Sequence, residues 1–263
     1  MNKAEIIKKI TEKKELSQLP KKDIEKVFGL FEKRETSDED KIKLARKKLH
    51  EVYTSVLSTK LLNSKIVDKK SAEEVLKKHI STRERFENYS EVYKKLLKGF
   101  ENSNLNIFDL GAGINGLSYN FLKEINNDLD YLAVEAVGQL VSLMNYYFKT
   151  RGLDDNARAI SESLFELEKI KKYLGQVEGK RVIFLFKVLD SLEMVERNYS
   201  KKLISELLPL VDRIVVSFAT ESLVSKKKFK VKRYWFENFL KEEEIKIVDD
   251  FEIGGERYLI LEK

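Results

Sequence analysis

Residues 106–116 read Asn-Ile-Phe-Asp-Leu-Gly-Ala-Gly-Ile-Asn-Gly, an apolar run that passes through an acidic residue into a glycine-rich turn. Glycines at 111, 113 and 116 lack the Cβ atoms that would keep a ligand away from the backbone. The residues from Leu117 to Ile125 are expected to form a helix whose N-terminus faces this turn. Two interpretations are open at this point, a cofactor site and an ordinary tight turn between a strand and a helix.

The kind of cofactor depends on the acidic residue. The glycine spacing fits the dinucleotide pattern G-x-G-x-x-G, which by itself is a weak signal. Asp109 stands two residues before the first glycine, where its carboxylate would repel a pyrophosphate but suits the cationic methionine moiety of S-adenosylmethionine. S-adenosylmethionine is therefore favoured, and an NAD-dependent enzyme remains a more distant alternative.

Short apolar runs alternate with helical stretches after this turn, as in a parallel sheet covered on both faces. Strands are predicted at Leu105–Leu110, Tyr131–Val134, Ala157–Ile160, Arg181–Val188 and Arg213–Phe218, and further helices at Gly138–Arg151, Leu164–Tyr173 and Ser200–Leu208. The end of the chain reads as a hairpin, Ile245–Asp250 and Arg257–Leu261 around Gly254-Gly255. This layout predicts an α/β, Rossmann-like class I S-adenosylmethionine-dependent methyltransferase fold.

The first 102 residues have a helical pattern throughout. Apolar residues recur at helical spacing within residues 41–62, at Ala45, Leu49, Val52 and Val56. A small all-helical domain is therefore expected at residues 1–102, followed by a cofactor-binding methyltransferase domain at residues 103–263.

Charge differs between these two parts. Residues 1–102 hold 26 basic and 18 acidic residues, whereas residues 103–263 hold 24 and 26. The basic excess indicates either contact with a polyanion or well-solvated helix surfaces. One helix face carries Arg46, Lys47 and Lys48, which are candidates for RNA contacts.

Composition excludes several kinds of chemistry. The chain has no cysteine and two histidines, His50 and His79, so thiolate chemistry is ruled out and neither a metal centre nor histidine-based catalysis is expected. No apolar run approaches the roughly 18 residues that span a bilayer. A cytoplasmic protein without membrane contact is expected.

Three acidic residues follow predicted strand ends, where ligands bind in open α/β sheets. Glu135 is placed to accept the ribose hydroxyls of an adenosine, and Glu162 to stand near its adenine amino group, while Asp109 precedes the glycine turn. Each acid taken alone is better explained as a solvated strand end or a helix N-cap. Together with the glycine turn they favour cofactor binding.

Four blocks in order support a family resemblance: His79–Phe86, Asp109–Leu117, Phe184–Glu193 and Val215–Leu223. Over residues 75–263 the chain resembles the aminoglycoside-resistance methyltransferases of small-subunit ribosomal RNA. The resemblance implies transfer of a methyl group from S-adenosyl-L-methionine, leaving S-adenosylhomocysteine, to N7 of a decoding-site guanine of 16S rRNA. The implied partner is the small ribosomal subunit, and we expect a monomer.

The resemblance also implies roles for individual residues. Arg85 would pair with the methionine carboxylate, Glu135 would hold the ribose, Glu162 and Ser163 would flank the adenine, and Phe186 would line the pocket. The remaining implied cofactor-binding residues are His79, Ser81, Thr82, Arg83, Asp109, Gly111 and Gly113. The implied loop beside the target base contains Ser217, Phe218, Thr220 and Ser222, and Lys226, Lys227 and Lys228 would contact RNA. We expect no catalytic acid or base, because N7 of guanine carries an unprotonated lone pair.

The sequence departs from the family pattern near both ligands. Glu135 stands in place of a common Asp, Gly116 and Ala219 in place of frequent prolines, and Val224–Lys228 in place of a glycine-rich segment. These differences bear on the target nucleotide more than on the cofactor. Methylation of another rRNA or tRNA position, or a non-catalytic RNA-binding scaffold, are the alternative functions.

Overall fold

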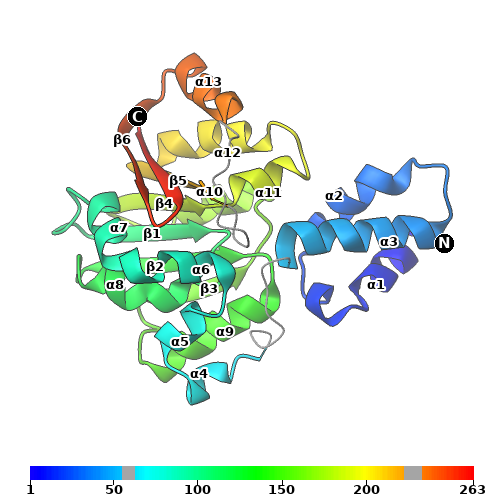
Figure 1. The fold of residues 1–263 in the computed structure, drawn as a ribbon, viewed down its shortest axis with the longest axis horizontal. Helices are drawn as coiled ribbons and strands as arrows, with labels where there is room; N and C mark the ends of the chain where they lie inside the picture. Colours follow the sequence, from blue (N-terminus) through cyan, green and yellow to red (C-terminus); the bar gives the residue numbers. More distant parts are fainter. Residues whose placement is uncertain (55–62, 222–232) are drawn as a thin grey trace.

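A seven-stranded sheet forms the centre of the computed structural model, which describes residues 1–54, 63–221 and 233–263 apart from the side chains of residues 54, 80 and 81 (Figure 1). The strand order is β3-β2-β1-β4-β5-β7-β6. The strands are β1 (Leu105–Leu110), β2 (Leu129–Glu135), β3 (Ala157–Ser161), β4 (Lys180–Phe186), β5 (Arg213–Ala219), β6 (Lys246–Ile253) and β7 (Glu256–Glu262). The first five pair in parallel and β7 pairs antiparallel with β5 and β6, which confirms the predicted sheet and terminal hairpin.

Strand β1 is buried along its whole length, as expected for the middle of a sheet covered on both faces. Its residues are in register with β2 on one side and with β4 on the other. Strand β4 ends at Phe186, two residues earlier than predicted, because Lys187 has a positive φ of 55° and turns the chain at the edge of the sheet. This turn lies where the strand order reverses, between β1 and β4.

Helices cover both faces of the sheet (Figure 1). On one face lie α7, α8 and α9, and on the other α10, α12 and α13. Their bounds are α7 (Tyr89–Leu96), η5 (Asn115–Ser118), α8 (Tyr119–Lys123), α9 (Gly138–Thr150), α10 (Leu167–Leu174), α11 (Leu189–Glu193), α12 (Tyr199–Leu207), η6 (Leu208–Leu210) and α13 (Tyr234–Glu242). The helix predicted over 117–125 is thus a 3₁₀ turn followed by a short α-helix.

The N-terminal helices divide into two groups. Helices α1 (Lys3–Thr11), α2 (Lys21–Glu32) and α3 (Asp38–Leu49), with the short turns η1 (Lys14–Leu16) and η2 (His50–Thr54), stand to one side of the sheet (Figure 1). Helices α4 (Ile66–Lys69), α5 (Ala72–Leu76) and α6 (Ile80–Arg85), with η4 (Phe86–Asn88) and α7, lie against it. In α7, Tyr93 stacks on Phe184 of β4 with ring centroids 5.9 Å apart. The part that stands apart is therefore smaller than the predicted helical domain of residues 1–102.

The separate helices meet the sheet domain at the start of α9. Gln139 donates a hydrogen bond to the Lys14 carbonyl over 2.7 Å. Gly138 has no room for a side chain, because a Cβ there would lie 2.9 Å from Cβ of Gln18. Lys26 of α2 forms an ion pair with Glu196. These contacts hold α2 beside the carboxyl ends of the parallel strands. Within the described part of the chain, no helix has the length and apolarity to cross a bilayer.

Candidate cofactor site

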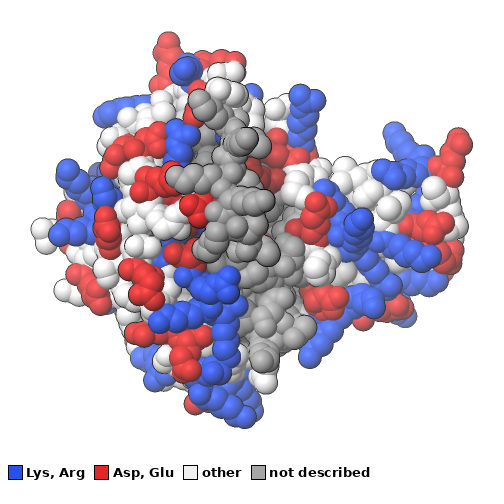
Figure 2. All heavy atoms as spheres, viewed as in Figure 1, with Lys and Arg blue, Asp and Glu red and all other residues white. Residues whose placement is uncertain are grey.

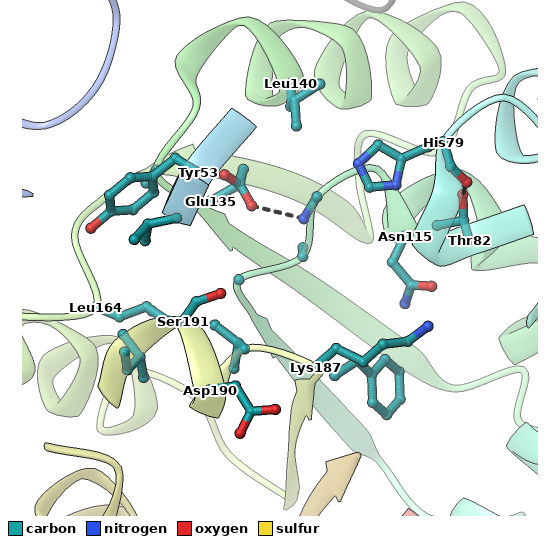
Figure 3. Close-up of a pocket in the computed structure, with 18 of the residues that line it drawn as sticks. Tyr53, His79, Thr82, Asn115, Glu135, Leu140, Leu164, Lys187, Asp190 and Ser191 are labelled. Carbon is teal, nitrogen blue, oxygen red and sulfur yellow. Dashed lines mark hydrogen bonds between the residues drawn. The ribbon is translucent and has the colours of Figure 1, made fainter. Parts of the chain in front are cut away.

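A cavity of about 380 Å³ opens at the carboxyl ends of β1, β2 and β4 (Figure 3). Its size is that of a small-molecule site. The walls come from the glycine turn, from the ends of the strands, from α6, and from the separate N-terminal helices. They include Asp23, Val52, Tyr53, His79, Thr82, Arg85, Gly111, Ala112, Gly113, Asn115, Glu135, Ala136, Leu140, Leu164, Phe186, Lys187, Val188, Asp190, Ser191, Leu192, Ala219 and Arg233.

The three glycines of the turn have different roles. Gly111 (φ 75°) is pressed against Val188, since a Cβ there would lie 2.6 Å from Cγ2 of that residue. A Cβ on Gly116 would lie 2.9 Å from both Met144 and Phe148, so this glycine allows η5 to pack on α9. Gly113 (φ 58°) has more room, with its nearest such contact 3.5 Å away at His79. Gly111 and Gly116 are thus required by internal packing, and Gly111 and Gly113 line the cavity.

Glu135 lies at the end of β2 and lines the cavity (Figure 3). Its Oε2 accepts a hydrogen bond from the backbone N–H of Gly113, and its Oε1 one from that of Val137, each over 2.8 Å. Burial raises the pKa of this carboxyl group, and the two backbone donors oppose that effect. Because a carboxylate has about four acceptor positions, Glu135 retains acceptors for a ligand.

Asp109, in contrast, does not line the cavity. It accepts hydrogen bonds from the Tyr131 hydroxyl over 2.6 Å and from the Asn115 side-chain amide over 2.7 Å. Burial raises the pKa of its carboxyl group as well. Its predicted contact with the cofactor stays a prediction, because Asp109 is not among the residues that line the cavity. Asp109 orients Asn115, which does line the cavity.

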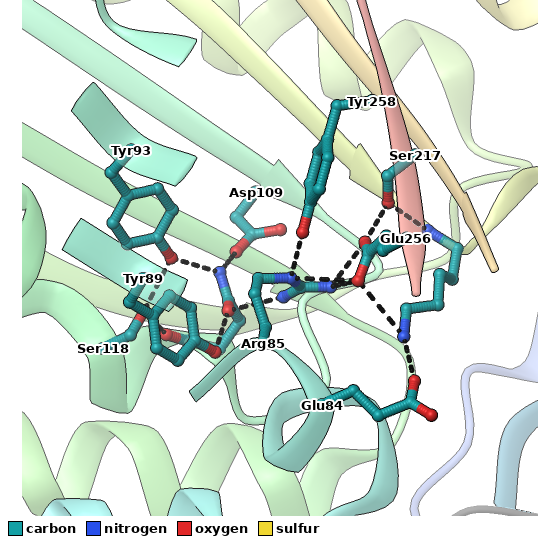
Figure 4. A network of polar contacts seen from close by, with 11 residues as sticks. Glu84, Arg85, Tyr89, Tyr93, Asp109, Ser118, Ser217, Glu256 and Tyr258 are labelled. Carbon is teal, nitrogen blue, oxygen red and sulfur yellow. Dashed lines mark hydrogen bonds and ion pairs between the residues drawn. The ribbon is translucent and has the colours of Figure 1, made fainter. Parts of the chain in front are cut away.

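Arg85 lies in a buried polar network (Figure 4). Its Nη2 donates to both carboxylate oxygens of Glu256, over 2.9 and 3.2 Å, and its Nη1 donates to Asn115 over 2.9 Å. Its Nε donates to the Tyr258 hydroxyl over 3.2 Å. The guanidinium predicted to bind the methionine carboxylate thus already has a carboxylate partner from β7. Sequence reasoning missed this partner because Glu256 is 171 residues away along the chain.

Lys187 extends the same network. Its Nζ lies 2.8 Å from Glu84 and 3.2 Å from Glu256. Burial alone would raise the pKa of Glu256, but Arg85 and Lys187 hold it below its ordinary value. Ser217, predicted to lie beside the target base, donates to Glu256 and is fully buried (Figure 4). It therefore takes part in this network and is not among the residues that line the cavity.

Of the residues in and beside α6 that were predicted to bind the cofactor, some line the cavity and one is exposed on the surface. Thr82 and Arg85, three positions apart, face the cavity with the preceding His79, whereas Arg83 is exposed. The prediction that Arg83 contacts the cofactor is thus not matched by its placement, because the helical period turns it to solvent. Ser81 lies in α6, but its side chain is outside the described part.

His79 is buried beside two cations. Burial, with the charges of Arg85 and Lys187, lowers its pKa to about 4. Its imidazole is therefore neutral near pH 7. A neutral imidazole adds no positive charge to a pocket whose far end carries carboxylates.

The described residues that were predicted around the adenine and the target base are not among those that line the cavity. Glu162 accepts hydrogen bonds from the Ser163 backbone and from Lys169, each over 3.1 Å. Phe218 is packed between Phe236 and Arg233, as a core residue would be. Ser163 accepts a hydrogen bond from the Phe165 backbone, and Thr220 donates one to Glu252. Phe186 lines the cavity, as predicted. Four predicted residues lie outside the described part of the chain: Ser222, Lys226, Lys227 and Lys228.

The predicted basic face of α3 is partly used inside the molecule. Arg46 donates to backbone carbonyls at the end of α1, those of Lys9 and Ile10, and lies 3.3 Å from Glu12. Lys48 pairs with Glu51 over 3.2 Å. Lys47 is exposed. Of the three, Lys47 is therefore the residue best placed to meet a polyanion.

No protein-family model matches the sequence, and a search of curated proteins gives no significant match. Among solved structures, the 16S rRNA methyltransferase RmtF in complex with S-adenosyl-L-homocysteine is similar with a TM-score of 0.79 at 19% identity, over 100% of this chain and 99% of that one. The 16S rRNA methylase RmtB gives the same TM-score and identity over the same shares. This chain has the class I methyltransferase fold.

Two further structures bear on how far the likeness extends. An rRNA methylase from Escherichia coli matches with a TM-score of 0.78 at 18% identity, over 100% of both chains. The 16S rRNA methylase ArmA is 26% identical, with a TM-score of 0.55, over 77% of this chain and 95% of that one. The methyltransferase fold predicted from the glycine turn and the terminal hairpin is thereby confirmed. In the matches that span the whole chain, the likeness includes the separate N-terminal helices.

Proposed function

We propose that this protein belongs to the 16S rRNA methyltransferases that it resembles, and that it methylates N7 of the decoding-site guanine with S-adenosylmethionine, thereby conferring aminoglycoside resistance. One observation carries the proposal. A fold shared over the whole chain with 16S rRNA methylases surrounds a cavity at the strand ends where this fold binds ligands. The first three sequence blocks named above, and residues 215–221 of the fourth, lie along the same edge of the sheet or in the segments next to it.

The cavity is chemically suited to S-adenosylmethionine, which supplies an activated methyl group when bound. Glu135 is the acceptor for the ribose hydroxyls, and the apolar side chains of Leu140 and Leu164 offer walls for the adenine (Figure 3). Asp23 and Glu135, two carboxylates with no cationic partner among the described residues, line the cavity and offer acceptors for the hydrogen-bond donors of an adenosine. Arg85 and Lys187 lie toward the other end, where the cofactor carboxylate is expected.

Methylation at N7 requires positioning rather than proton transfer. The N7 lone pair is unprotonated at neutral pH, so the protein has to align it with the methyl group and exclude water. In A-form RNA this atom lies in a deep, narrow groove that side chains cannot enter, so the guanine has to leave the helix. Tyr234 is 59% exposed and follows Arg233, which lines the cavity, and we expect its ring to stack on such a base.

Exposed basic residues beside the cavity offer a surface for the rRNA. Lys and Arg side chains gather over α4 to α6 (Figure 2), where Lys65, Lys69 and Arg83 are exposed. With Lys47 of α3 they would meet phosphates on two sides of the site. This surface adds to the basic face of α3 predicted from the sequence. A ribosomal substrate also agrees with a cytoplasmic location.

The test is methyl transfer by purified protein to isolated small subunits, with labelled S-adenosylmethionine and mapping of the modified nucleotide by mass spectrometry. We expect label at N7 of the decoding-site guanine. Label on a different rRNA position, or only on tRNA, would refute the target while leaving the methyltransferase assignment intact. No label on any RNA, with S-adenosylhomocysteine still bound, would instead indicate a non-catalytic scaffold.

A further inference from the structure

Asp23 is an acidic residue in the first turn of α2, in the part of the chain that stands apart from the sheet. It is 1% exposed and lines the cavity. Its Oδ1 accepts a hydrogen bond from the Tyr53 hydroxyl. Its Oδ2 is buried and has no hydrogen-bond partner among the described residues. A buried carboxylate oxygen without a donor is costly, so its retention calls for an explanation.

The surroundings of Asp23 do not supply that explanation. An acid in the first turn of a helix is stabilised by the helix dipole, but this effect is available equally to an exposed side chain. Burial raises the pKa of the Asp23 carboxyl group, and the nearby charge of Glu162 raises it further. The hydroxyls of Tyr53 and Ser163 oppose this rise but do not cancel it, so the pKa stays above its ordinary value. The charge of Asp23 in turn raises the pKa of Glu135, and both residues line the cavity.

We propose that Asp23 accepts a hydrogen bond from a donor of the adenosine portion of the bound cofactor, so that the separate N-terminal helices complete the cofactor pocket. This inference rests on the proposed function, because it takes S-adenosylmethionine as the ligand. The adenosine portion carries suitable donors, the adenine amino group and the ribose hydroxyls. Either would supply the missing partner of Oδ2.

The position of Asp23 distinguishes the adenosine end from the methionine end. Tyr53, which donates a hydrogen bond to Asp23, lies on the side of Glu135, whereas Lys187 lies across the cavity from it (Figure 3). Glu162 and Ser163, predicted to flank the adenine, do not line the cavity. Asp23 therefore takes over the contact that was expected from Glu162.

The binding test compares Asp23→Asn with Glu25→Gln, a matched change on the same helix at a half-buried residue that does not line the cavity. Calorimetry measures the affinity for S-adenosylhomocysteine and for 5′-methylthioadenosine, which lacks the amino-acid end. We expect Asp23→Asn to weaken both ligands at least tenfold and Glu25→Gln to change neither by more than twofold. Without ligand, Asp23→Asn should melt at the same or a higher temperature than the wild type, because it removes an unpartnered buried charge.

Several results would overturn the inference. Wild-type affinity for S-adenosylhomocysteine in folded Asp23→Asn would remove the contact, and a loss for S-adenosylhomocysteine but not for 5′-methylthioadenosine would move it to the ammonium group. Failure of the wild type to bind S-adenosylhomocysteine would overturn the proposed function as well. Hydrogen exchange of the wild type gives a second measurement if the variant does not fold: the ligand should protect the amides of residues 23–27, and unchanged exchange there contradicts the proposal.

Discussion

At one end of the pocket Arg85 and Lys187 meet Glu84 and Glu256 in a closed set of ion pairs, whereas at the other end Asp23 and Glu135 have no cationic partner among the described residues. Both ends are buried and charged. The closed end satisfies itself and therefore contributes to the stability of the fold. The open end is left to be satisfied by a ligand, and it is the end to which the N-terminal helices contribute.

The largest expected effect is on the closed end. Glu256→Ala leaves the guanidinium of Arg85 buried without its carboxylate partner, and the loss of one member of a buried pair costs about 3–5 kcal/mol. Urea unfolding should show this loss in the free energy of unfolding. A loss below about 1 kcal/mol would mean that Arg85 finds another partner, and that this end is not closed.

The second prediction concerns pH and the histidine beside the closed end. The pKa of His79 is lowered from 6.5 to about 4 in the folded state, so its contribution to stability is fully present above pH 6.5 and is lost as the pH falls toward 4. The shift corresponds to roughly 3 kcal/mol. His79→Gln should unfold with a weaker pH dependence between pH 6.5 and 4 than the wild type. Identical pH profiles would show that His79 titrates normally.

The third prediction concerns ligand affinity at the open end. Glu135→Gln removes the charge that we propose holds the ribose hydroxyls, and a charge-assisted hydrogen bond contributes about 1.5–3 kcal/mol. Calorimetry with S-adenosylhomocysteine should show a loss of tenfold or more. Glu162→Gln is the matched control, because Glu162 does not line the cavity, and we expect a change below threefold. Equal losses of affinity in both variants would instead support the predicted contact between Glu162 and the adenine.

The smallest effect is expected on the surface of α3. There Arg46 has partners within the protein, whereas Lys47 is exposed. Lys47→Glu should weaken binding to small subunits and lower the slope of log affinity against log salt by about one unit. Arg46→Ala should instead lower stability by about 1 kcal/mol, because Arg46 binds the carbonyls at the end of α1. Lys241→Glu, an exposed site on α13, controls for net charge. A slope unchanged by Lys47→Glu would mean that this face is only solvated.

The sequence by itself determined the sheet and the location of the site. Apolar runs such as Leu105–Leu110, the glycine turn and the terminal hairpin are local signals, because strand burial, positive φ angles and tight turns depend on neighbouring residues. The same local signals pointed to Gly113 and Glu135, which line the cavity. Arg85 also lines the cavity, but it was predicted from the family resemblance.

Only the tertiary structure decided which charges are closed and which are open. Arg85 and Glu256 are 171 residues apart. Asp23 reaches the cavity because the segment before α2 packs against the start of α9 and Lys26 of α2 pairs with Glu196. Asp109, an expected cofactor contact, instead binds Tyr131 and Asn115. Side-chain partners of this kind depend on distances between elements far apart in the chain, and no local pattern of residue types records those distances.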